Sequence, residues 1–222
     1  MEPNLPKVVQ RFMSEVAVGE HGLTKLKIEL KSSSWLMRGI SRIVSVFNPR
    51  FDQYITTLGN TIYVPDGFLE KQPIRVLETV AHETQHAMDF NCSPVLFVLV
   101  YGFPQILAVP VGIAVGLLTG LWWLGLVVGL LLLAPLPAPG RCWMEIRAYR
   151  TSLQVGRYVY RFSDREMERT KEWIVSQLSE KWYYWTWPFP SMIKRALDKD
   201  SLLDKPGHVK LIKFLAEHDL SM

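Results

Sequence analysis

The chain has 222 residues, of which 49% are hydrophobic and 21% are charged, and its formal net charge is +4. This length suits one compact unit, or one compact unit with an added membrane element. The basic residues are scattered rather than gathered into a run, and no nucleic-acid-binding motif accompanies them, so we expect no nucleic-acid partner. The first residues do not resemble a signal peptide, so we expect no export.

Two helices are predicted in the N-terminal part of the chain by apolar residues at helical spacing. One covers Pro6 to Val18 and the other covers Trp35 to Phe47. In the second helix the apolar residues form a stripe, with arginines and serines between them. We expect this stripe to face a hydrophobic core, and the alternative is that it lies in a membrane interface.

A small β element is predicted around the second of these helices. Residues Leu23 to Leu30 alternate between apolar and charged side chains, which is typical of a strand. Residues Tyr54 to Val64 are rich in β-branched and aromatic residues around Gly59-Asn60, which predicts a strand or a short hairpin. This element is either an ordinary internal strand or an edge strand that pairs with an extended peptide.

A long apolar segment lies in the middle of the chain. No Asp, Glu, Lys, Arg or His occurs from Cys92 through Gly140. Because a transmembrane helix needs about 20 apolar residues, this segment is long enough for two crossings joined by a tight turn. We expect the turn at Pro110-Val111-Gly112 or at Thr119-Gly120, with Ile113 to Leu133 as the clearer span and a kinked or only partly inserted first segment. A buried hairpin in a soluble protein is the alternative.

The residues after the apolar segment predict a series of helices with one aromatic interruption. A capping box at Ser163-Asp164-Arg165-Glu166 marks the start of one helix. The predicted helices cover Arg141 to Arg161, Ser163 to Glu180, Ser191 to Leu197 and His208 to His218. The aromatic residues from Trp182 to Phe189 lie either in a membrane interface or in a core. The two cysteines, Cys92 and Cys142, are expected to be free thiols.

A metal-binding motif lies within a helix that is predicted over Pro73 to Phe90. His82-Glu83-Thr84-Gln85-His86 has the form HExxH. Residues four apart share one face of a helix, so both imidazoles can reach one metal ion. The glutamate beside the first histidine is then placed to act as a general base on a water molecule whose pKa zinc lowers toward neutrality. The motif therefore predicts a zinc site held by His82 and His86, with Glu83 as the base.

A third protein ligand is expected, because two histidines and one water leave a position open around zinc. Asp89 follows His86 by three residues and is one candidate, either as a ligand or as a residue that orients His86. The alternative for Asp89 is a solvent-facing position on the helix surface.

The better candidate for the third ligand is Glu145, in the segment Trp143-Met144-Glu145-Ile146-Arg147-Ala148-Tyr149. Its Glu-x-x-Ala pattern, on a helix that follows an HExxH helix, resembles that of the glutamate-type zincins, the gluzincins. The two predicted spans between the motifs resemble the layout of the HtpX and CAAX prenyl protease family of membrane zinc peptidases. The resemblance implies that His82, His86 and Glu145 are the zinc ligands and that Glu83 is the catalytic base.

The chain departs from that family in several respects, and the resemblance covers residues 73–195 at most. Phe189 stands where the family often has the histidine of a His-Pro segment. Arg195, at a similar spacing to the family's arginine, is therefore either structural or a contact to the transition state. Tyr149 stands where the family usually has aspartate, which implies different surroundings for His82 or His86. The additional hydrophobic spans that are typical of the family are also missing.

The elements and the resemblance together predict a zincin-like catalytic domain, α+β and mainly α, with a small β element and an inserted hydrophobic helical hairpin. We divide the chain into residues 1–91 with the HExxH helix, residues 92–140 as the membrane hairpin, and residues 141–222 with the third ligand. Two crossings by the hairpin return Glu145 to the side of the membrane that holds the histidines. The arginines that follow the hairpin, Arg141, Arg147 and Arg150, predict that this side is cytoplasmic.

We therefore expect a membrane-associated zinc metalloendopeptidase that acts on a protein or peptide substrate at the lipid bilayer. The alternative is a non-enzymatic membrane scaffold, or an envelope-interacting protein, with a structural or vestigial metal site. A zinc hydrolase that acts on a non-peptide amide is a third hypothesis.

Overall fold

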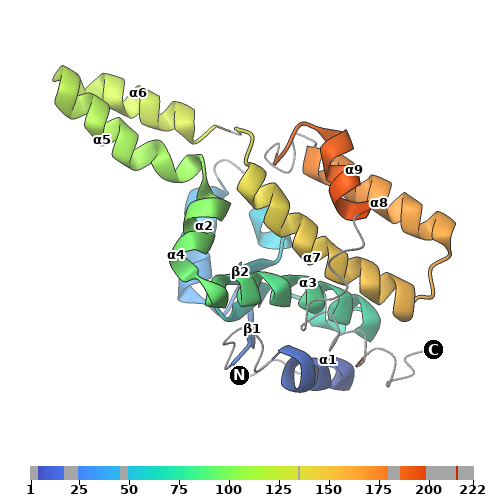
Figure 1. Ribbon diagram of the computed structural model, residues 1–222. Coiled ribbons are helices and arrows are strands. Elements are labelled where there is room, and N and C mark those ends of the chain that lie inside the picture. Colours follow the sequence, from blue (N-terminus) through green and yellow to red (C-terminus); the bar gives the residue numbers. More distant parts are fainter. Residues whose placement is uncertain are drawn as a thin grey trace. The chain divides into compact units, whose positions relative to one another are not determined.

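The computed structural model of the chain describes residues 5–17, 25–45, 50–134, 136–179, 186–198 and 214 (Figure 1). These residues are mainly helical and contain one three-stranded sheet, so the predicted fold class, α+β and mainly α, is confirmed. The chain divides by its packing into two compact units. The first comprises Met1–Pro94, Ala148–Ser163 and Ser201–Met222, and the second comprises Val95–Arg147 and Asp164–Asp200.

The sheet belongs to the first unit and has the strand order β1-β3-β2. Strand β3 (Thr61–Val64) is central, parallel to β1 (Lys27–Leu30) and antiparallel to β2 (Thr56–Leu58). The hairpin turn between β2 and β3 contains Gly59, whose φ of 58° is in the left-handed region that glycine adopts without strain. The predicted strand before residue 31 and the predicted hairpin around Gly59-Asn60 are both confirmed.

The core of the first unit lies between the sheet and helix α3 (Pro73–Cys92). Helix α1 (Lys7–Phe12) and the C-terminal part of helix α7 (Pro139–Tyr158) complete it. Its fully or almost fully buried side chains are Val9, Phe12, Ile62, Val64, Val76, Leu77, Val80 and Val155. Each buried side chain of this kind stabilises the fold by roughly 1.5–3 kcal/mol relative to exposure, so this core fixes α3 and the Ala148–Tyr158 part of α7 against each other.

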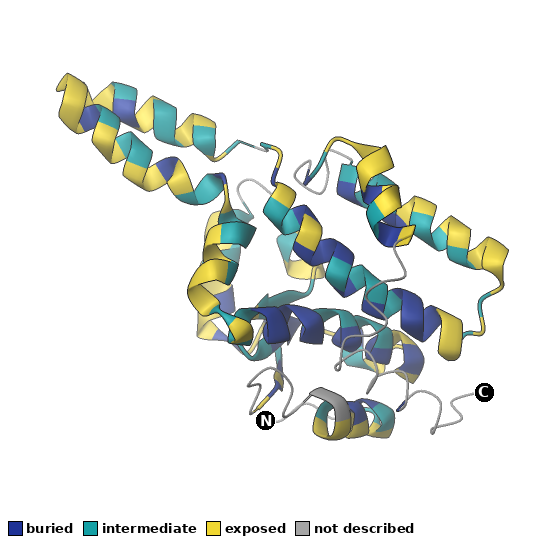
Figure 2. Cartoon of the chain, in the orientation of Figure 1, coloured by how far each residue is buried: buried dark blue, intermediate teal, exposed yellow. Residues whose placement is uncertain are grey.

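Helix α2 (Trp35–Val44) forms as predicted, but the expectation that its apolar stripe faces a core is wrong. Ser34 caps the helix by accepting a hydrogen bond from the Met37 backbone N–H. Met37 is the buried residue of the helix, whereas Trp35 is 78% exposed and Ile43 is 70% exposed. Helix α3, by contrast, consists largely of buried and half-buried residues (Figure 2). The periodic pattern identifies an apolar face, but it does not say whether another element covers that face.

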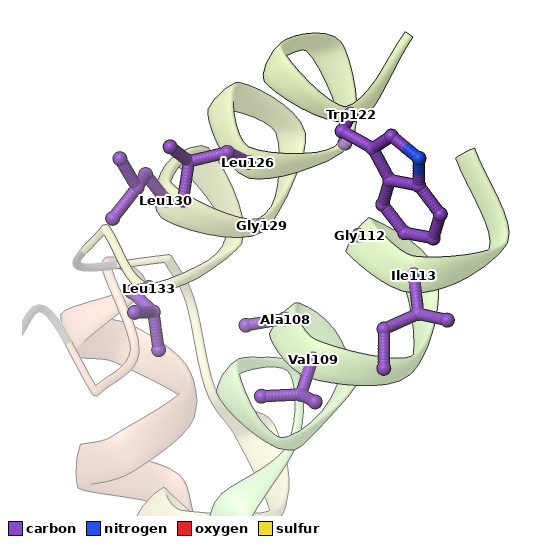
Figure 3. A pocket seen from close by; sticks show the side chains of 10 residues that line it. Ala108, Val109, Gly112, Ile113, Trp122, Leu126, Gly129, Leu130 and Leu133 are labelled. Atoms are coloured by element: carbon purple, nitrogen blue, oxygen red, sulfur yellow. The ribbon is translucent and has the colours of Figure 1, made fainter. Parts of the chain in front are cut away.

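The second unit contains a hairpin of helices α5 (Ala108–Thr119) and α6 (Trp122–Leu132), which lie side by side (Figure 1). Glycines line their contact, and a Cβ atom added to Gly125 would collide with the Gly112 carbonyl oxygen. The two backbones therefore approach more closely than any other residue type would allow, a packing that is common between membrane helices. One open side of the hairpin forms a mostly apolar groove of about 320 Å³, lined by Val109, Ile113, Trp122, Leu126 and Leu130 among others (Figure 3).

The prediction of a single span over Ile113 to Leu133 is wrong. Gly120, with a φ of 70°, ends α5 in a left-handed conformation, so the turn falls at Thr119-Gly120, one of the two predicted positions. In the described part of the chain, no individual helix has the length and apolar character needed to cross a membrane. Helix α4 (Pro94–Gly102) and the helical residues Gln105–Thr119 meet these criteria only as a pair, and they are bent by 95° at the break.

Helices α7, α8 (Asp164–Ser179) and α9 (Pro190–Asp198) confirm three of the predicted C-terminal helices. Helices α8 and α9 pack together in the second unit, where Lys171 forms ion pairs with Glu168 and Asp198. Apart from Phe214, the predicted helix over His208 to His218 falls outside the described residues, as does most of the predicted aromatic cluster.

Candidate metal centre

The two histidines of the HExxH motif lie one turn apart on the same face of α3. Pro73 occupies the first turn of this helix, where its missing N–H costs nothing, and the buried residues Val76 and Val80 anchor the opposite part of the helix in the core. The rings of His82 and His86 are 5.2 Å apart between centroids and inclined at 75°. His86 is buried and His82 is half-buried, so the face that carries them is covered at one end and accessible at the other.

Helix α7 runs beside His82 and supplies two contacts to its imidazole. The Tyr149 ring contacts the His82 ring edge-on, with 4.7 Å between centroids. The Ser152 hydroxyl lies 3.5 Å from His82 Nδ1. Both residues belong to the part of α7 that packs in the first unit. Glu145 lies one turn before Tyr149 in the same continuous helix, so the two side chains share one face of α7. Glu145 is on the side of this face toward His86.

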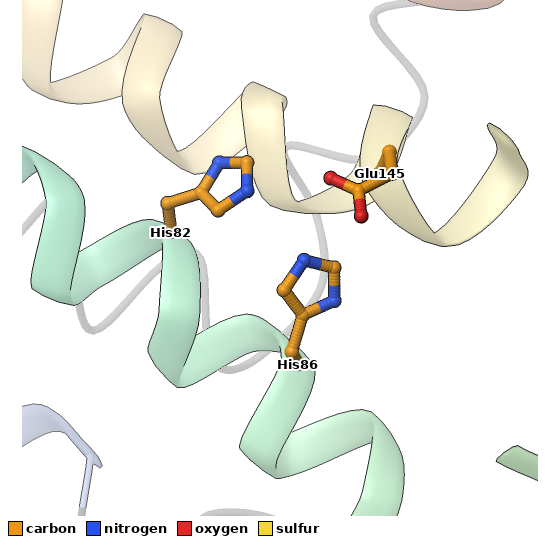
Figure 4. Close-up of side chains that lie close together, drawn as sticks. All are labelled: His82, His86 and Glu145. Atoms are coloured by element: carbon orange, nitrogen blue, oxygen red, sulfur yellow. The ribbon is translucent and has the colours of Figure 1, made fainter. Parts of the chain in front are cut away.

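One ligand atom from each of His82, His86 and Glu145 lies within 4.8 Å of the other two (Figure 4). Glu145 is 1% exposed. A tetrahedral zinc ion with bonds of about 2.0–2.2 Å needs ligand atoms roughly 3.3 Å apart, so small side-chain adjustments are sufficient to close the group around the ion. The three residues predicted as ligands are therefore brought together in a buried group that could hold a metal ion.

Glu83 is not a member of this group and has a different partner. Its Oε2 accepts a hydrogen bond of 2.7 Å from the Thr57 hydroxyl, which projects from strand β2. Glu83 is half-buried, so its carboxylate is fixed by Thr57 without being removed from solvent. Sequence reasoning did not identify Thr57, because only the tertiary packing of β2 against α3 brings the two side chains together.

Asp89 is buried at the C-terminal end of the same helix face, so the alternative of a solvent-facing aspartate is wrong. Its Oδ1 accepts a hydrogen bond of 2.9 Å from Gln85 Nε2. Among the described residues, Asp89 is not part of the group that could hold a metal. Its predicted role in orienting His86 stays a prediction.

Glu145 is itself held by a residue of the apolar segment. The Tyr101 hydroxyl, on α4, donates a hydrogen bond of 2.7 Å to Glu145 Oε1. Arg141 donates from Nε to the Tyr101 carbonyl and from its terminal nitrogen to Gln105 Oε1, and its guanidinium lies over the Tyr101 ring. Gln105 in turn donates to the Ala134 carbonyl. A continuous polar network therefore joins the third candidate ligand to the base of the apolar hairpin.

Sequence reasoning did not identify this network, although the sequence holds a signal for it. Tyr101 and Gln105 are polar side chains four residues apart within a segment that has no ionisable Asp, Glu, Lys, Arg or His. Polar side chains in such a segment are costly unless they are hydrogen-bonded, and so they mark contacts to other elements.

Several titratable groups around the centre are shifted by their surroundings. Burial raises the pKa of Glu78, which lies one turn before His82 and near the Tyr160 hydroxyl. Burial, with a smaller contribution from Glu145, raises the pKa of the Cys142 thiol to about 12. Burial lowers the pKa of Lys31 to about 8, opposed by the negative charges of Asp52 and Glu83. Cys92 and Cys142 are both free thiols, as predicted.

The remaining predicted site residues differ in their placement. Tyr149, which was predicted to change the surroundings of His82 or His86, contacts the His82 ring directly. Arg195 is exposed in the last turn of α9, a helix that packs against α8. A role for Arg195 at a transition state stays a prediction.

Comparison with known proteins gave no match: no protein family, no curated protein and no solved structure matched this chain.

Proposed function

We propose that this chain is a membrane-associated zinc metallopeptidase of the zincin type, which hydrolyses peptide bonds with Glu83 as general base. The single observation that supports this proposal best is the buried group of His82, His86 and Glu145. Glu83 is not part of this group and is held by Thr57. A purely structural zinc site uses four protein ligands, whereas three protein ligands leave a position for water or substrate.

A zinc ion held by these three residues would supply a Lewis acid and an activated water molecule. Glu83 would take the proton from the attacking water and pass it to the amine that leaves as the peptide bond breaks. Thr57 would hold the Glu83 carboxylate in one orientation through its hydroxyl, so that the accepting oxygen faces the reacting water. Because His82 is half-buried, a substrate would approach from the His82 side of the group.

Strand β2 supports a protein or peptide as the substrate. It is an outer strand of the sheet, and its residue Thr57 contacts the proposed base. An extended peptide that adds to the outer edge of β2 would therefore pass close to Glu83.

The apolar helices support the membrane part of the proposal. Helices α4, α5 and α6 carry no charged side chain, and many of their large apolar residues are exposed. The arginines that follow them, Arg141, Arg147 and Arg150, favour a cytoplasmic location for the catalytic residues.

The test combines metal analysis with a peptide-cleavage assay. Purified protein is expected to contain about one zinc per chain, and His86→Ala is expected to remove it. Glu83→Gln is expected to keep the zinc and to lower the rate of cleavage by about a thousand-fold or more, because the base is lost. Glu172→Gln, an exposed position on α8, is the matched control and is expected to change neither.

Full activity in Glu83→Gln would contradict the mechanism. Zinc binding without cleavage of any peptide by the unaltered protein would favour the alternative of a non-enzymatic membrane protein with a structural metal site.

A further inference from the structure

Helix α2 has one face on the protein and one face that no element among the described residues covers. Met37 is buried, and Ser41, one turn further on, donates a hydrogen bond to Asp52. Trp35, Gly39 and Ile43 lie two residues before or after these positions, on the opposite side of the helix. Trp35 and Ile43 are among the most exposed large apolar side chains of the first unit, and a Cβ atom added at Gly39 would meet nothing within 4 Å.

The exposed stripe is bordered by positive charge on one side and by apolar side chains on the other. Arg38 and Arg42 are one turn apart and both exposed. Leu36 is partly exposed and Ile40 is half-buried on the other border. An apolar stripe that begins with tryptophan and is flanked by arginines is the arrangement of helices that lie in the plane of a membrane interface.

The size of the stripe argues against a protein partner. A ten-residue helix is only about 15 Å long, and its exposed apolar side chains offer on the order of 400 Å². A stable protein interface needs about 800 Å² from each partner. A bilayer has no minimum contact area, and its anionic headgroups complement the two arginines.

We propose that α2 docks on the surface of an anionic lipid bilayer, with Trp35 and Ile43 inserted among the lipids and Arg38 and Arg42 at the headgroups. This contact is additional to the apolar helices α4 to α6, and it does not depend on the metal centre. It gives the first unit a lipid contact of its own.

The experiment places an environment-sensitive fluorophore on single cysteines of the full-length protein. In a Cys92→Ser background, which leaves only the buried Cys142, the dye is attached at Ile43→Cys on α2, at Leu118→Cys on α5, or at Glu172→Cys on α8. The probes are vesicles of phosphatidylcholine containing about one-third phosphatidylglycerol and a quencher attached high on the acyl chain. The Ile43 label is expected to be quenched, and the Glu172 label is expected not to be.

Charge dependence is tested in the same assay. Arg38→Gln with Arg42→Gln is expected to raise the anionic lipid concentration needed for half-maximal quenching at Ile43 by roughly thirty-fold, and to leave quenching on neutral vesicles unchanged. The matched control is Arg165→Gln with Arg169→Gln on α8, two exposed arginines also four residues apart, for which less than a two-fold change is expected.

The three labels separate this inference from the proposed function. Quenching at Leu118 without quenching at Ile43 would overturn the role of α2 and leave the membrane hairpin standing. Quenching at Ile43 without quenching at Leu118 would support the role of α2 and overturn the membrane hairpin. Protection of the Ile43 label that depends on protein concentration and needs no vesicles would also overturn the inference, because a second copy of the chain would then cover the stripe.

Discussion

Helix α3 buries polar side chains, whereas the hairpin of α5 and α6 exposes apolar ones. In α3, Gln85, His86 and Asp89 are all buried. In the hairpin, Leu118 is 87% exposed, and the contact between the two helices is made by glycines rather than by leucines. The two regions therefore distribute their side chains in opposite ways.

This difference indicates what each region binds or faces. Buried polar groups are retained where they make hydrogen bonds or bind a ligand, and in α3 Gln85 donates to Asp89 while Glu83 accepts from Thr57. Exposed leucines are tolerable where the surroundings are themselves apolar, and glycine contacts pack helices without help from water. We infer a metal as the occupant of the first region and lipid as the surroundings of the second.

Removal of the acidic candidate ligand is expected to have the largest effect. Glu145→Ala is expected to weaken zinc binding by about a hundred-fold or more, because one of three protein ligands is lost. Competition with a zinc chelator measures the affinity. An unchanged affinity would mean that Glu145 does not bind the ion, and the buried carboxylate of α7 would need another explanation.

The next largest effect is expected from a side chain that forces α5 and α6 apart. A side chain at Gly125 would collide with the Gly112 carbonyl, so Gly125→Val is expected to destabilise the hairpin by about 1–3 kcal/mol. Thermal unfolding in detergent micelles, followed by circular dichroism, is the measurement. Leu118→Val, on the exposed side of α5, is the control and is expected to have little effect. Equal stability of the two variants would show that the close backbone contact does not hold the hairpin.

A hydrogen bond from Tyr101 on α4 joins the apolar segment to Glu145, and the third prediction concerns this bond. Tyr101→Phe removes the hydroxyl that donates to Glu145, and it is expected to weaken zinc binding by about ten-fold while zinc is still bound. Tyr158→Phe, near the end of α7, is the matched control and should leave the affinity unchanged. If both variants behave alike, the hydroxyl of Tyr101 does not position the ligand.

The smallest expected effect concerns pH and Lys31, which is 5% exposed. Its ammonium donates to the Phe51 carbonyl and lies over the Phe51 ring, yet burial lowers its pKa from 10.5 to about 8. Between these two pH values the folded chain binds fewer protons than the unfolded chain. The free energy of unfolding therefore rises with pH from about 8 to 10.5, and this contribution of Lys31 is absent below pH 8.

Lys31→Met tests this assignment, because methionine has a similar length and no charge. Urea unfolding of both proteins at pH 8 and pH 10 gives the change in unfolding free energy with pH, and the increase is expected to be smaller in the variant. An identical pH dependence in the two proteins would show that Lys31 keeps its ordinary pKa in the folded chain.

The parts of the fold that depend on local spacing could be predicted from the sequence. The helix of the HExxH motif and the hairpin at Gly59-Asn60 follow from periodicity and turn chemistry, and both are found. The break at Gly120 was predicted only as one of two positions, because the apolar segment contains many glycines and only packing selects the one that turns the chain.

The parts that depend on tertiary packing could not be predicted. The HExxH motif predicts a metal site from local sequence, but Thr57 and Tyr101 reach the candidate site through contacts that span 26 and 44 residues. The exposure of α2 was missed for the same reason, since an amphipathic helix looks the same in sequence whether protein or lipid covers its apolar face.

Anomalous scattering at the zinc absorption edge, from crystals of the full-length protein, tests the metal centre most directly. We expect one peak at about 2.0–2.2 Å from a nitrogen of His82, a nitrogen of His86 and an oxygen of Glu145. A peak bound by the histidines with Glu145 directed elsewhere, or no peak at this position in protein that contains zinc, would contradict the proposed centre.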